Sequence, residues 1–230
     1  MILTVLVPVY NEAGTILEIL AKVRDQRLDG VELEVLVVDD GSTDATPRLL
    51  AEHPQLYDRL IRMPVNGGKG AAVREGIRQA RGGYILFQDA DLEYDPADYV
   101  KMVFPVLKFG ATLVVGSRFS NPDYTRVFYY WHKVGNWLIT LFFNLMFNTT
   151  FTDIYTCYVL FKKTLIDPNQ LGTNGWEQHA EILSTAMRQR CVAFEVPINY
   201  NGRTYEDGKK IRWHHIFGIF RVIFRVRLFG

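Results

Sequence analysis

Apolar strands that alternate with amphipathic helices dominate the first half of this chain. Residues 2–9, 31–38 and 84–88 are nearly continuous apolar runs, and residues 15–23 carry apolar side chains at helical spacing. Near-continuous apolar strands are typical of a parallel sheet whose two faces are both covered by helices. Parallel neighbours also need a crossover connection, which the helices between the strands supply. The sequence therefore predicts an α/β fold with a largely parallel central sheet.

Shorter patterns locate the remaining elements. We expect a helix around Leu49 and Leu50, with Ser42, Thr43 or Asp44 as its cap. Further expected elements are strands at 60–63 and 111–116 and helices at 71–81 and 98–109. Beyond residue 95 the alternation weakens, and aromatic and basic residues become frequent. The sequence contains no internal repeat, low-complexity tract or linker that would mark a domain boundary.

Polar clusters follow four of the predicted strands at the points where these strands end. The clusters are residues 8–12, 39–40, 66–70 and 89–93. In open α/β sheets, ligands bind at the carboxyl ends of the strands, which lie along one edge. The four clusters therefore predict one binding site on that edge.

The last cluster holds three acidic side chains at alternate positions, Asp89, Asp91 and Glu93. Residues two apart in extended backbone point the same way, so these carboxylates can converge on one hard cation such as Mg²⁺ or Mn²⁺. The alternative is a solvated acidic turn, because so short a pattern is weakly specific. The glycine-rich turn around Lys69 allows a diphosphate to approach closely, but it lacks the spacing of a P-loop.

Composition limits the class of protein. Of the 230 residues, 48% are hydrophobic and 22% are charged, which is ordinary for a globular protein and argues against intrinsic disorder. The net charge of +1 argues against nucleic-acid binding. No apolar run reaches the roughly 18 residues of a membrane span, and the first residues are typical of a strand rather than of a signal peptide. The two distant cysteines, Cys157 and Cys191, fit a reducing compartment.

Ordered motifs along the chain resemble those of the family-2 glycosyltransferases. In the first half they lie at residues 7–12, 37–44, 66–70 and 89–91. Motifs at residues 116–119, 132–136, 152–153, 156–158 and 200–211 look like those of the polyprenyl-phosphate glycosyltransferases, the group typified by dolichyl-phosphate mannose synthase. The resemblance implies a nucleotide-diphospho-sugar transferase fold of GT-A type, which is Rossmann-like, with a C-terminal amphipathic helical segment.

The resemblance also implies an activity. A metal-dependent, inverting hexosyltransferase of this group moves a hexose from a UDP- or GDP-sugar to polyprenyl or dolichyl phosphate, and is peripherally associated with the cytoplasmic face of a membrane. Residues 1–212 would form one transferase domain, with a nucleotide-sugar half at 1–95 and an acceptor half at 96–212, and residues 213–230 a membrane-interface segment. Two other interpretations stay open, namely a saccharide or glycan acceptor, and a non-catalytic nucleotide-sugar binding module at a membrane.

Site residues are carried over from the same resemblance. Asp39 is expected to accept N–H groups of the base, Glu12 to lie near the ribose, and Asp91 and Glu93 to bind Mg²⁺ or Mn²⁺ beside the diphosphate. Relatives often carry Gln at the position of Glu93. The whole set expected to bind the nucleotide-sugar is Pro8, Val9, Tyr10, Glu12, Asp39, Lys69, Asp89, Ala90 and Asp91.

The acceptor decides which further groups are needed. A sugar hydroxyl requires a general base, whereas a phosphate oxygen is already anionic near neutral pH and requires only positioning and screening of charge. For the acceptor phosphate we expect Arg118, Lys133 and Asn136. Arg203 and Lys209 lie in a segment with two glycines that is expected to close over the donor. The expected catalytic set is Asp89, Asp91, Arg118, Arg203 and Lys209.

Two features of the second half allow more than one interpretation. Where relatives commonly carry an acidic pair before Glu181, this chain reads Trp-Glu-Gln-His-Ala-Glu over residues 176–181, so His179 either has a catalytic role or is an ordinary core or surface histidine. Residues 131–147 and 213–229 are aromatic and amphipathic. They either lie in a membrane interface or pack on the core or on another subunit, and we expect membrane contact.

Overall fold

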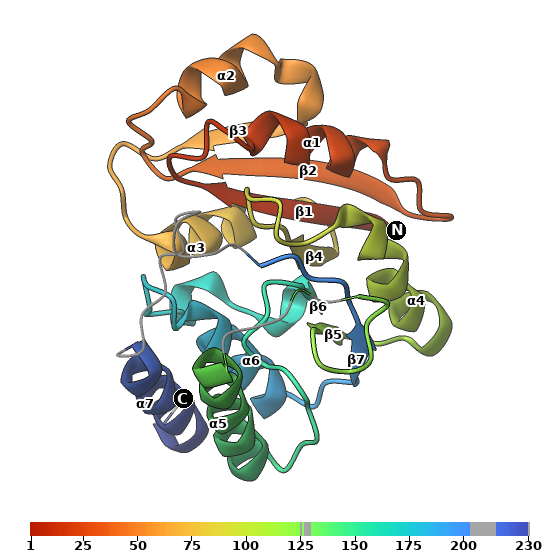
Figure 1. Cartoon of the computed structure of the whole chain (residues 1–230), viewed down its shortest axis with the longest axis vertical. Coiled ribbons are helices and arrows are strands. Elements are labelled where there is room, and N and C mark those ends of the chain that lie inside the picture. Colours follow the sequence, from red (N-terminus) through yellow and green to blue (C-terminus); the bar gives the residue numbers. More distant parts are fainter. Residues whose placement is uncertain (125, 127–129, 203–214, 230) are drawn as a thin grey trace.

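The computed structural model describes residues 1–124, 126, 130–202 and 215–229 of the chain. Within these residues, seven strands form one sheet through the centre of the molecule (Figure 1). Their spatial order is β3 (Arg59–Arg62), β2 (Glu32–Asp39), β1 (Ile2–Val9), β4 (Tyr84–Phe87), β6 (Val159–Lys162), β5 (Leu113–Ser117) and β7 (Ala193–Pro197).

Parallel pairing predominates in this sheet. Strand β1 runs parallel to both β2 and β4, and β2 runs parallel to β3. Strand β7 is parallel to β5, whereas β6 is antiparallel to its two neighbours β4 and β5. The predicted α/β class with a largely parallel sheet is confirmed, and the inserted antiparallel strand is an addition to it.

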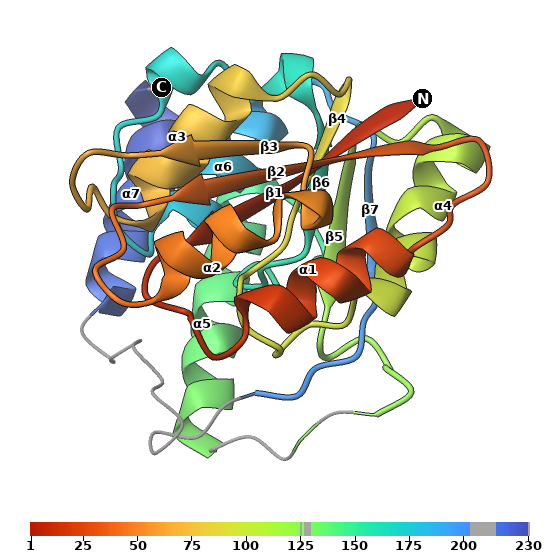
Figure 2. The ribbon, with the colours of Figure 1, turned by 90° about the horizontal axis from the view of Figure 1, so that it is seen from above.

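Helices cover both faces of the sheet. They are α1 (Ile16–Asp25), α2 (Thr46–Glu52), α3 (Lys69–Gln79), α4 (Tyr99–Phe109), α5 (Tyr130–Phe147), α6 (Gln178–Arg188) and α7 (His215–Phe229), with 3₁₀ turns at Pro54–Leu56, Pro96–Asp98, Lys163–Leu165 and Pro168–Gln170. Figures 1 and 2 place α1 and α2 on one face of strands β1 to β3 and α3 on the other. Val5, Leu6 and Val7 of β1 are fully buried although successive strand residues point to opposite faces. The prediction of a sheet covered on both faces, made from the continuous apolar runs, is therefore confirmed.

Some boundaries differ from those expected. Helix α3 begins at Lys69 rather than at residue 71, because Gly68, with a positive φ of 89°, ends the turn directly before it. Ala45 takes the cap position of α2, and Asp44 still accepts a hydrogen bond from the backbone N–H of Thr46, at 2.9 Å. Helix α6 and strands β6 and β7 were not predicted.

Helices α5, α6 and α7 pack together below the sheet in the view of Figure 1. Helix α7 buries one stripe at helical spacing, made of Ile219, Val222, Ile223 and Val226. Its other face and that of α5 expose large apolar side chains, with Trp131 of α5 77% exposed and Phe229 of α7 79% exposed. Among the described residues, no helix combines the length and apolar character needed to cross a bilayer.

Candidate functional site

A cavity of about 510 Å³ opens at the carboxyl ends of β1, β2 and β4. All four predicted polar clusters contribute to its wall, through Pro8, Val9, Tyr10, Glu12, Asp40, Asn66, Gly68, Lys69, Asp89, Ala90, Asp91 and Glu93. The same cavity continues to Trp131 and Asn136 of α5 and to Ile219 of α7. One edge of the sheet therefore gathers the clusters as predicted, and the cavity extends from them to the amphipathic helices.

The aspartates that end β2 hold the surrounding loops. The two carboxylate oxygens of Asp40 accept the backbone N–H groups of Gly67 and Gly68, at 2.8 and 2.9 Å. Burial raises the pKa of Asp40, while these two hydrogen bonds oppose that rise. Asp39 is buried and accepts the N–H of Ser42 at 2.9 Å. Asp40, rather than Asp39, is the one that lines the cavity.

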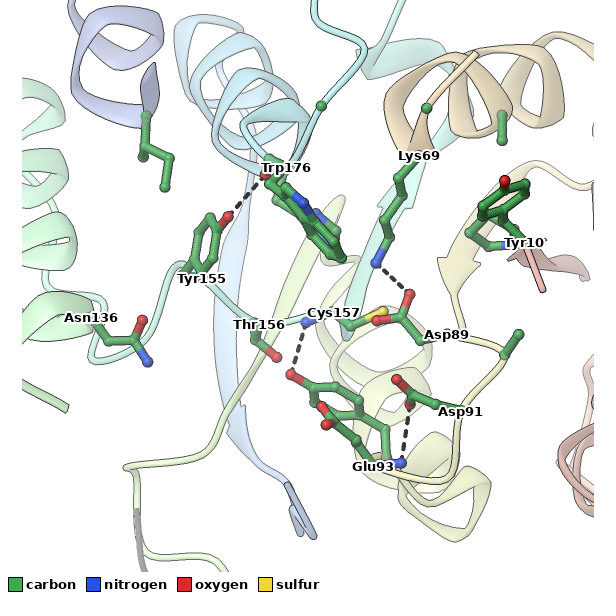
Figure 3. Close-up of a pocket in the computed structure, with 18 of the residues that line it drawn as sticks. Tyr10, Lys69, Asp89, Asp91, Glu93, Asn136, Tyr155, Thr156, Cys157 and Trp176 are labelled. Atoms are coloured by element: carbon green, nitrogen blue, oxygen red, sulfur yellow. Dashed lines mark hydrogen bonds and ion pairs between the residues drawn. The ribbon is translucent and has the colours of Figure 1, made fainter. Parts of the chain in front are cut away.

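Lys69 and Asp89 form an ion pair at the centre of the site (Figure 3). Burial by itself would raise the pKa of Asp89, but the positive charge of Lys69 outweighs it and lowers that pKa. The indole ring of Trp176 lies beside this pair, with its centroid 5.6 Å from Nζ of Lys69. Both charges are therefore present at neutral pH and are placed where an anionic ligand would meet the lysine.

Asp91 and Glu93 lie next to this pair on the same loop (Figure 3). Asp91 Oδ1 accepts the backbone N–H of Glu93 at 3.1 Å, and Glu93 Oε2 accepts the hydroxyl of Tyr200 at 2.9 Å. In the part of the chain that the structure describes, no group of three or more metal-ligating side chains is assembled. Two carboxylates are nevertheless enough for Mg²⁺ when substrate phosphates and water supply the other ligands. The donor set therefore fits a divalent cation held together with a diphosphate.

Cys157 and His179 contribute buried groups to the same wall. Burial, followed by the positive charge of Lys69, lowers the pKa of His179 to about 3. Its ring meets Phe87 of β4 edge to face, with centroids 5.9 Å apart, and contacts the amide of Gln178. His179 is thus a buried neutral histidine in the wall of the cavity, which agrees with the interpretation of an ordinary core histidine.

Arg118 reaches the cavity from the end of β5 and is anchored by a buried carboxylate. Its Nε and Nη2 donate to Asp153 at 2.7 and 2.9 Å, and Nη2 also donates to the carbonyl oxygen of Tyr155 at 2.7 Å. The side chains of Arg118 and Asp153 are only 7% and 0% exposed. Burial alone would lower the pKa of Arg118, but the charge of Asp153 raises it well above its ordinary value.

The other predicted acceptor residues are distributed unevenly. Asn136 of α5 lines the cavity, whereas Lys133, one turn earlier, is exposed and lies 5.9 Å from the ring of Phe119. Arg203 and Lys209 lie outside the described residues. Of the acceptor set, Arg118 and Asn136 are therefore the members that the described structure brings to the cavity.

Several lining residues had no assigned role in the sequence-based prediction. They are aromatic or polar side chains from loops, among them Tyr94 after the acidic cluster and Tyr155, Cys157, Trp176 and Tyr200 of the second half. Tyr155 donates its hydroxyl to the carbonyl oxygen of Trp176 at 3.1 Å, which ties two of these loops together (Figure 3). Trp176 stands in the segment that departs from the pattern of relatives, and that departure was the available signal.

Comparison with known sequences gives an independent result. Residues 4–167 match the family "Glycosyl transferase family 2". The chain is 31% identical over 203 residues to glycosyltransferase AglJ of Haloferax volcanii, covering 86% of this chain and 63% of that protein. It is also 31% identical over 233 residues to the dolichyl-phosphate beta-glucosyltransferase of Saccharomyces cerevisiae, covering 91% and 69%. The chain thus spans about two thirds of the length of these relatives.

Comparison with solved structures identifies the same fold. The glucosyl-3-phosphoglycerate synthase of Mycobacterium tuberculosis, solved with Mn²⁺, uridine diphosphate and phosphoglyceric acid, superposes with a TM-score of 0.71 at 18% sequence identity. The match covers 98% of this chain and 77% of that one. The expected GT-A type of fold is therefore confirmed, while so low an identity carries no conclusion about substrates.

Proposed function

The chain belongs to glycosyl transferase family 2, and we propose that it transfers a hexose from a nucleotide diphospho-sugar to a polyprenyl phosphate. The observation that carries the proposal is the continuity of one cavity from the polar loops of β1, β2 and β4 to the apolar helices α5 and α7. A lipid phosphate combines an anionic head with an apolar chain, and this is the chemistry that such a cavity accommodates. The yeast relative named for dolichyl phosphate supports the same class of acceptor.

The apolar end of the cavity suits the lipid chain. Trp131 and Ile139 of α5 line it together with Ile216 and Ile219 of α7. A prenyl chain that leaves the cavity between these helices would meet their exposed apolar faces. We therefore infer that the protein lies on a membrane through α5 and α7, at the cytoplasmic face, and that the segment expected at 213–230 acts through α7.

The charges of the cavity favour a phosphate acceptor over a sugar hydroxyl. Among the described residues, the carboxylates that line it all come from the donor-side loops: Glu12, Asp40, Asp89, Asp91 and Glu93. Towards α5, the basic side chains among the described lining residues are Arg118 and His132. A hydroxyl acceptor needs a base, and His179, with a pKa of about 3, is a weak one. A phosphate oxygen needs no base, and the guanidinium of Arg118 suits it.

A divalent cation, Mg²⁺ or Mn²⁺, belongs to this proposal. Asp91 and Glu93 would hold it together with the donor diphosphate. It would neutralise the charge that develops on the departing nucleoside diphosphate. The Mn²⁺ bound by the mycobacterial glucosyl-3-phosphoglycerate synthase supports use of such a cation on this fold.

The chain's own residues then have distinct tasks. The space for the nucleotide is lined by Pro8, Tyr10 and Glu12, and Lys69 presents a positive charge to the diphosphate. Arg118 and Asn136 orient the acceptor phosphate, whose oxygen forms the new bond to the anomeric carbon as the bond to the diphosphate breaks. A single displacement of this kind inverts the anomeric centre. Asp89 keeps Lys69 in place through their ion pair.

A radiolabelled donor screen tests the proposal. UDP- and GDP-hexoses are offered with Mn²⁺ or Mg²⁺, with and without a short polyprenyl phosphate, and label is counted in the organic phase. Lipid-linked label that requires both the cation and the polyprenyl phosphate is expected. Transfer to a saccharide without lipid product would favour the glycan-acceptor alternative, and nucleotide binding without any turnover would favour a non-catalytic module.

A further inference from the structure

The loop of residues 171–176 is pressed against the start of helix α3, the helix that begins with Lys69. The backbone N–H of Gly70 donates to the carbonyl oxygen of Asn174 at 2.8 Å. A Cβ atom at Gly70 would lie only 2.4 Å from the carbonyl oxygen of Thr173, so only glycine allows this approach. Arg74, one turn along α3, donates to the side-chain oxygen of Asn174 at 2.9 Å. This loop therefore borders the donor side of the cavity, which it lines through Asn174, Gly175 and Trp176.

The opposite side of the 171–176 loop is held by one buried carboxylate, that of Glu181 in α6. Glu181 is 2% exposed and accepts the backbone N–H of Gly172 at 3.1 Å. It also accepts both the N–H and the hydroxyl of Thr173, at 2.9 and 2.6 Å. A further donor comes from outside the loop, because Nη2 of Arg225 in α7 reaches Glu181 Oε1 at 2.6 Å. One carboxylate thus connects the loop to α7.

We propose that Arg225 is a positioning residue, which acts through Glu181 to hold the 171–176 loop against α3. The proposal rests on the function proposed above, because it makes the seating of α7 a determinant of donor binding. The loop carries Trp176, whose ring lies beside Lys69, and it borders the N-terminal turn of α3. When α7 lies against α6, the loop is fixed where the diphosphate and the hexose bind. A membrane contact of α7 would then favour the donor-binding state.

Arg225 can be tested without loss of the fold. Its side chain is 50% exposed, and α7 is seated by its buried apolar stripe rather than by this residue. Without Arg225, Glu181 keeps three hydrogen bonds from Gly172 and Thr173. The substitution Arg225→Gln therefore removes one charged contact to the Glu181 carboxylate and leaves the contacts of Glu181 with the loop in place.

Arg227 supplies a matched control on the same helix. It is also an exposed arginine, but its Nε donates to the carbonyl oxygen of Met146 in α5, and its guanidinium lies 5.7 Å from the ring of Phe147. Arg227→Gln therefore removes the same charge from α7 without touching Glu181. Arg225→Lys is the conservative variant, since a lysine retains a positive charge that can approach Glu181.

The experiment compares the full-length wild type with Arg225→Gln, Arg225→Lys and Arg227→Gln. Donor KM and kcat are measured at saturating polyprenyl phosphate, and hydrogen exchange is followed in peptides covering residues 170–176. We expect Arg225→Gln to raise donor KM by about tenfold, as for one lost hydrogen bond to a charged group, with a smaller effect on kcat. Exchange in the loop should quicken, and Arg225→Lys should restore part of both.

The two readouts separate this proposal from the proposed function. Hydrogen exchange needs neither donor nor acceptor, so faster exchange in Arg225→Gln alone supports the role of Arg225 even if no lipid-linked product forms. Exchange in Arg225→Gln that equals exchange in Arg227→Gln overturns it, whatever the activity. A donor KM that changes equally in the two variants would likewise overturn it, because the cause would be the charge of α7 and not the contact with Glu181.

Discussion

The buried pair of Arg118 and Asp153 gives the sharpest prediction for stability. Asp153 is fully buried and accepts the guanidinium of Arg118 through both carboxylate oxygens, at 2.7 and 2.9 Å. Asp153→Asn keeps the size and shape of the side chain but removes the negative charge, and its amide nitrogen turns one acceptor into a donor. Arg118 would then be a buried cation without a counter-charge, next to the cavity.

The expected cost follows from burial. Removing one partner of a buried ion pair destabilises a protein by about 3–5 kcal/mol, a large share of the roughly 5–15 kcal/mol that stabilises most native proteins. For a domain of this size each kcal/mol lowers Tm by about 2–4 °C, so Tm should fall by roughly 6–20 °C. Transfer to lipid phosphate should fall as well, even well below Tm, because the guanidinium is no longer held at the cavity.

Urea and thermal unfolding of wild type and Asp153→Asn measure this effect. Glu18→Gln is the control, because Glu18 pairs with Lys22 at 3.1 Å on the surface, where both side chains are about half exposed. Such an exposed pair within a helix contributes only about 0.3–0.5 kcal/mol. If Asp153→Asn destabilised the protein by less than about 1 kcal/mol, similar to that control, the buried pair would not have the role in stability that we assign to it.

Three further predictions concern the metal site, the histidine and the membrane surface. Asp91→Asn should lower turnover by at least about 100-fold while leaving the urea midpoint unchanged; retained turnover would refute its role as a metal ligand. Burial and the charge of Lys69 lower the pKa of His179 to about 3. Below a pH of about 6.5 the unfolded chain therefore binds a proton at His179 while the native protein does not, so the free energy of unfolding decreases as the pH falls. His179→Gln should reduce the loss measured by urea unfolding between about pH 7 and pH 5, and an identical loss would show that His179 is not held neutral. The double variant Leu145→Ser/Phe229→Ser should sediment less with anionic vesicles than the wild type, whereas Phe104→Ser, which removes an exposed apolar side chain from α4, should not. Equal binding by the wild type, the double variant and Phe104→Ser would exclude α5 and α7 as the membrane contact.

The first half of the fold could be predicted because its signals are local. Strand β1 was expected at 2–9 and occupies Ile2–Val9, since an apolar run buried on both faces shows in the sequence itself. The gathering of the polar clusters followed from the rule that parallel strands end along one edge. Strand β6, at Val159–Lys162, was missed because it lies beyond residue 95, where the regular alternation of strands and helices that located β3 and β4 weakens. Its antiparallel place between β4 and β5 depends on long-range pairing.

Many residues of the site could be predicted from the sequence, but the side chains that they contact could not. Arg118 was expected to face the acceptor, yet no local pattern shows that Asp153, 35 positions later, neutralises it. Trp176 reaches the cavity on the 171–176 loop, which lies against α3, and the need for glycine at position 70 becomes evident once Thr173 is seen beside it. Asp40 lines the cavity where Asp39 was expected, because neighbouring residues at a strand end point in opposite directions.

The identity of the accepting group tests the central claim most directly. The purified protein is given a labelled nucleotide-hexose and a divalent cation with either a polyprenyl phosphate or the matching polyprenol, two lipids that differ only in the phosphate. We predict lipid-linked label with the phosphate and none with the alcohol, and loss of that label in Asp91→Asn. Equal transfer to the alcohol, or transfer to a saccharide while the lipid phosphate stays unlabelled, would contradict the account.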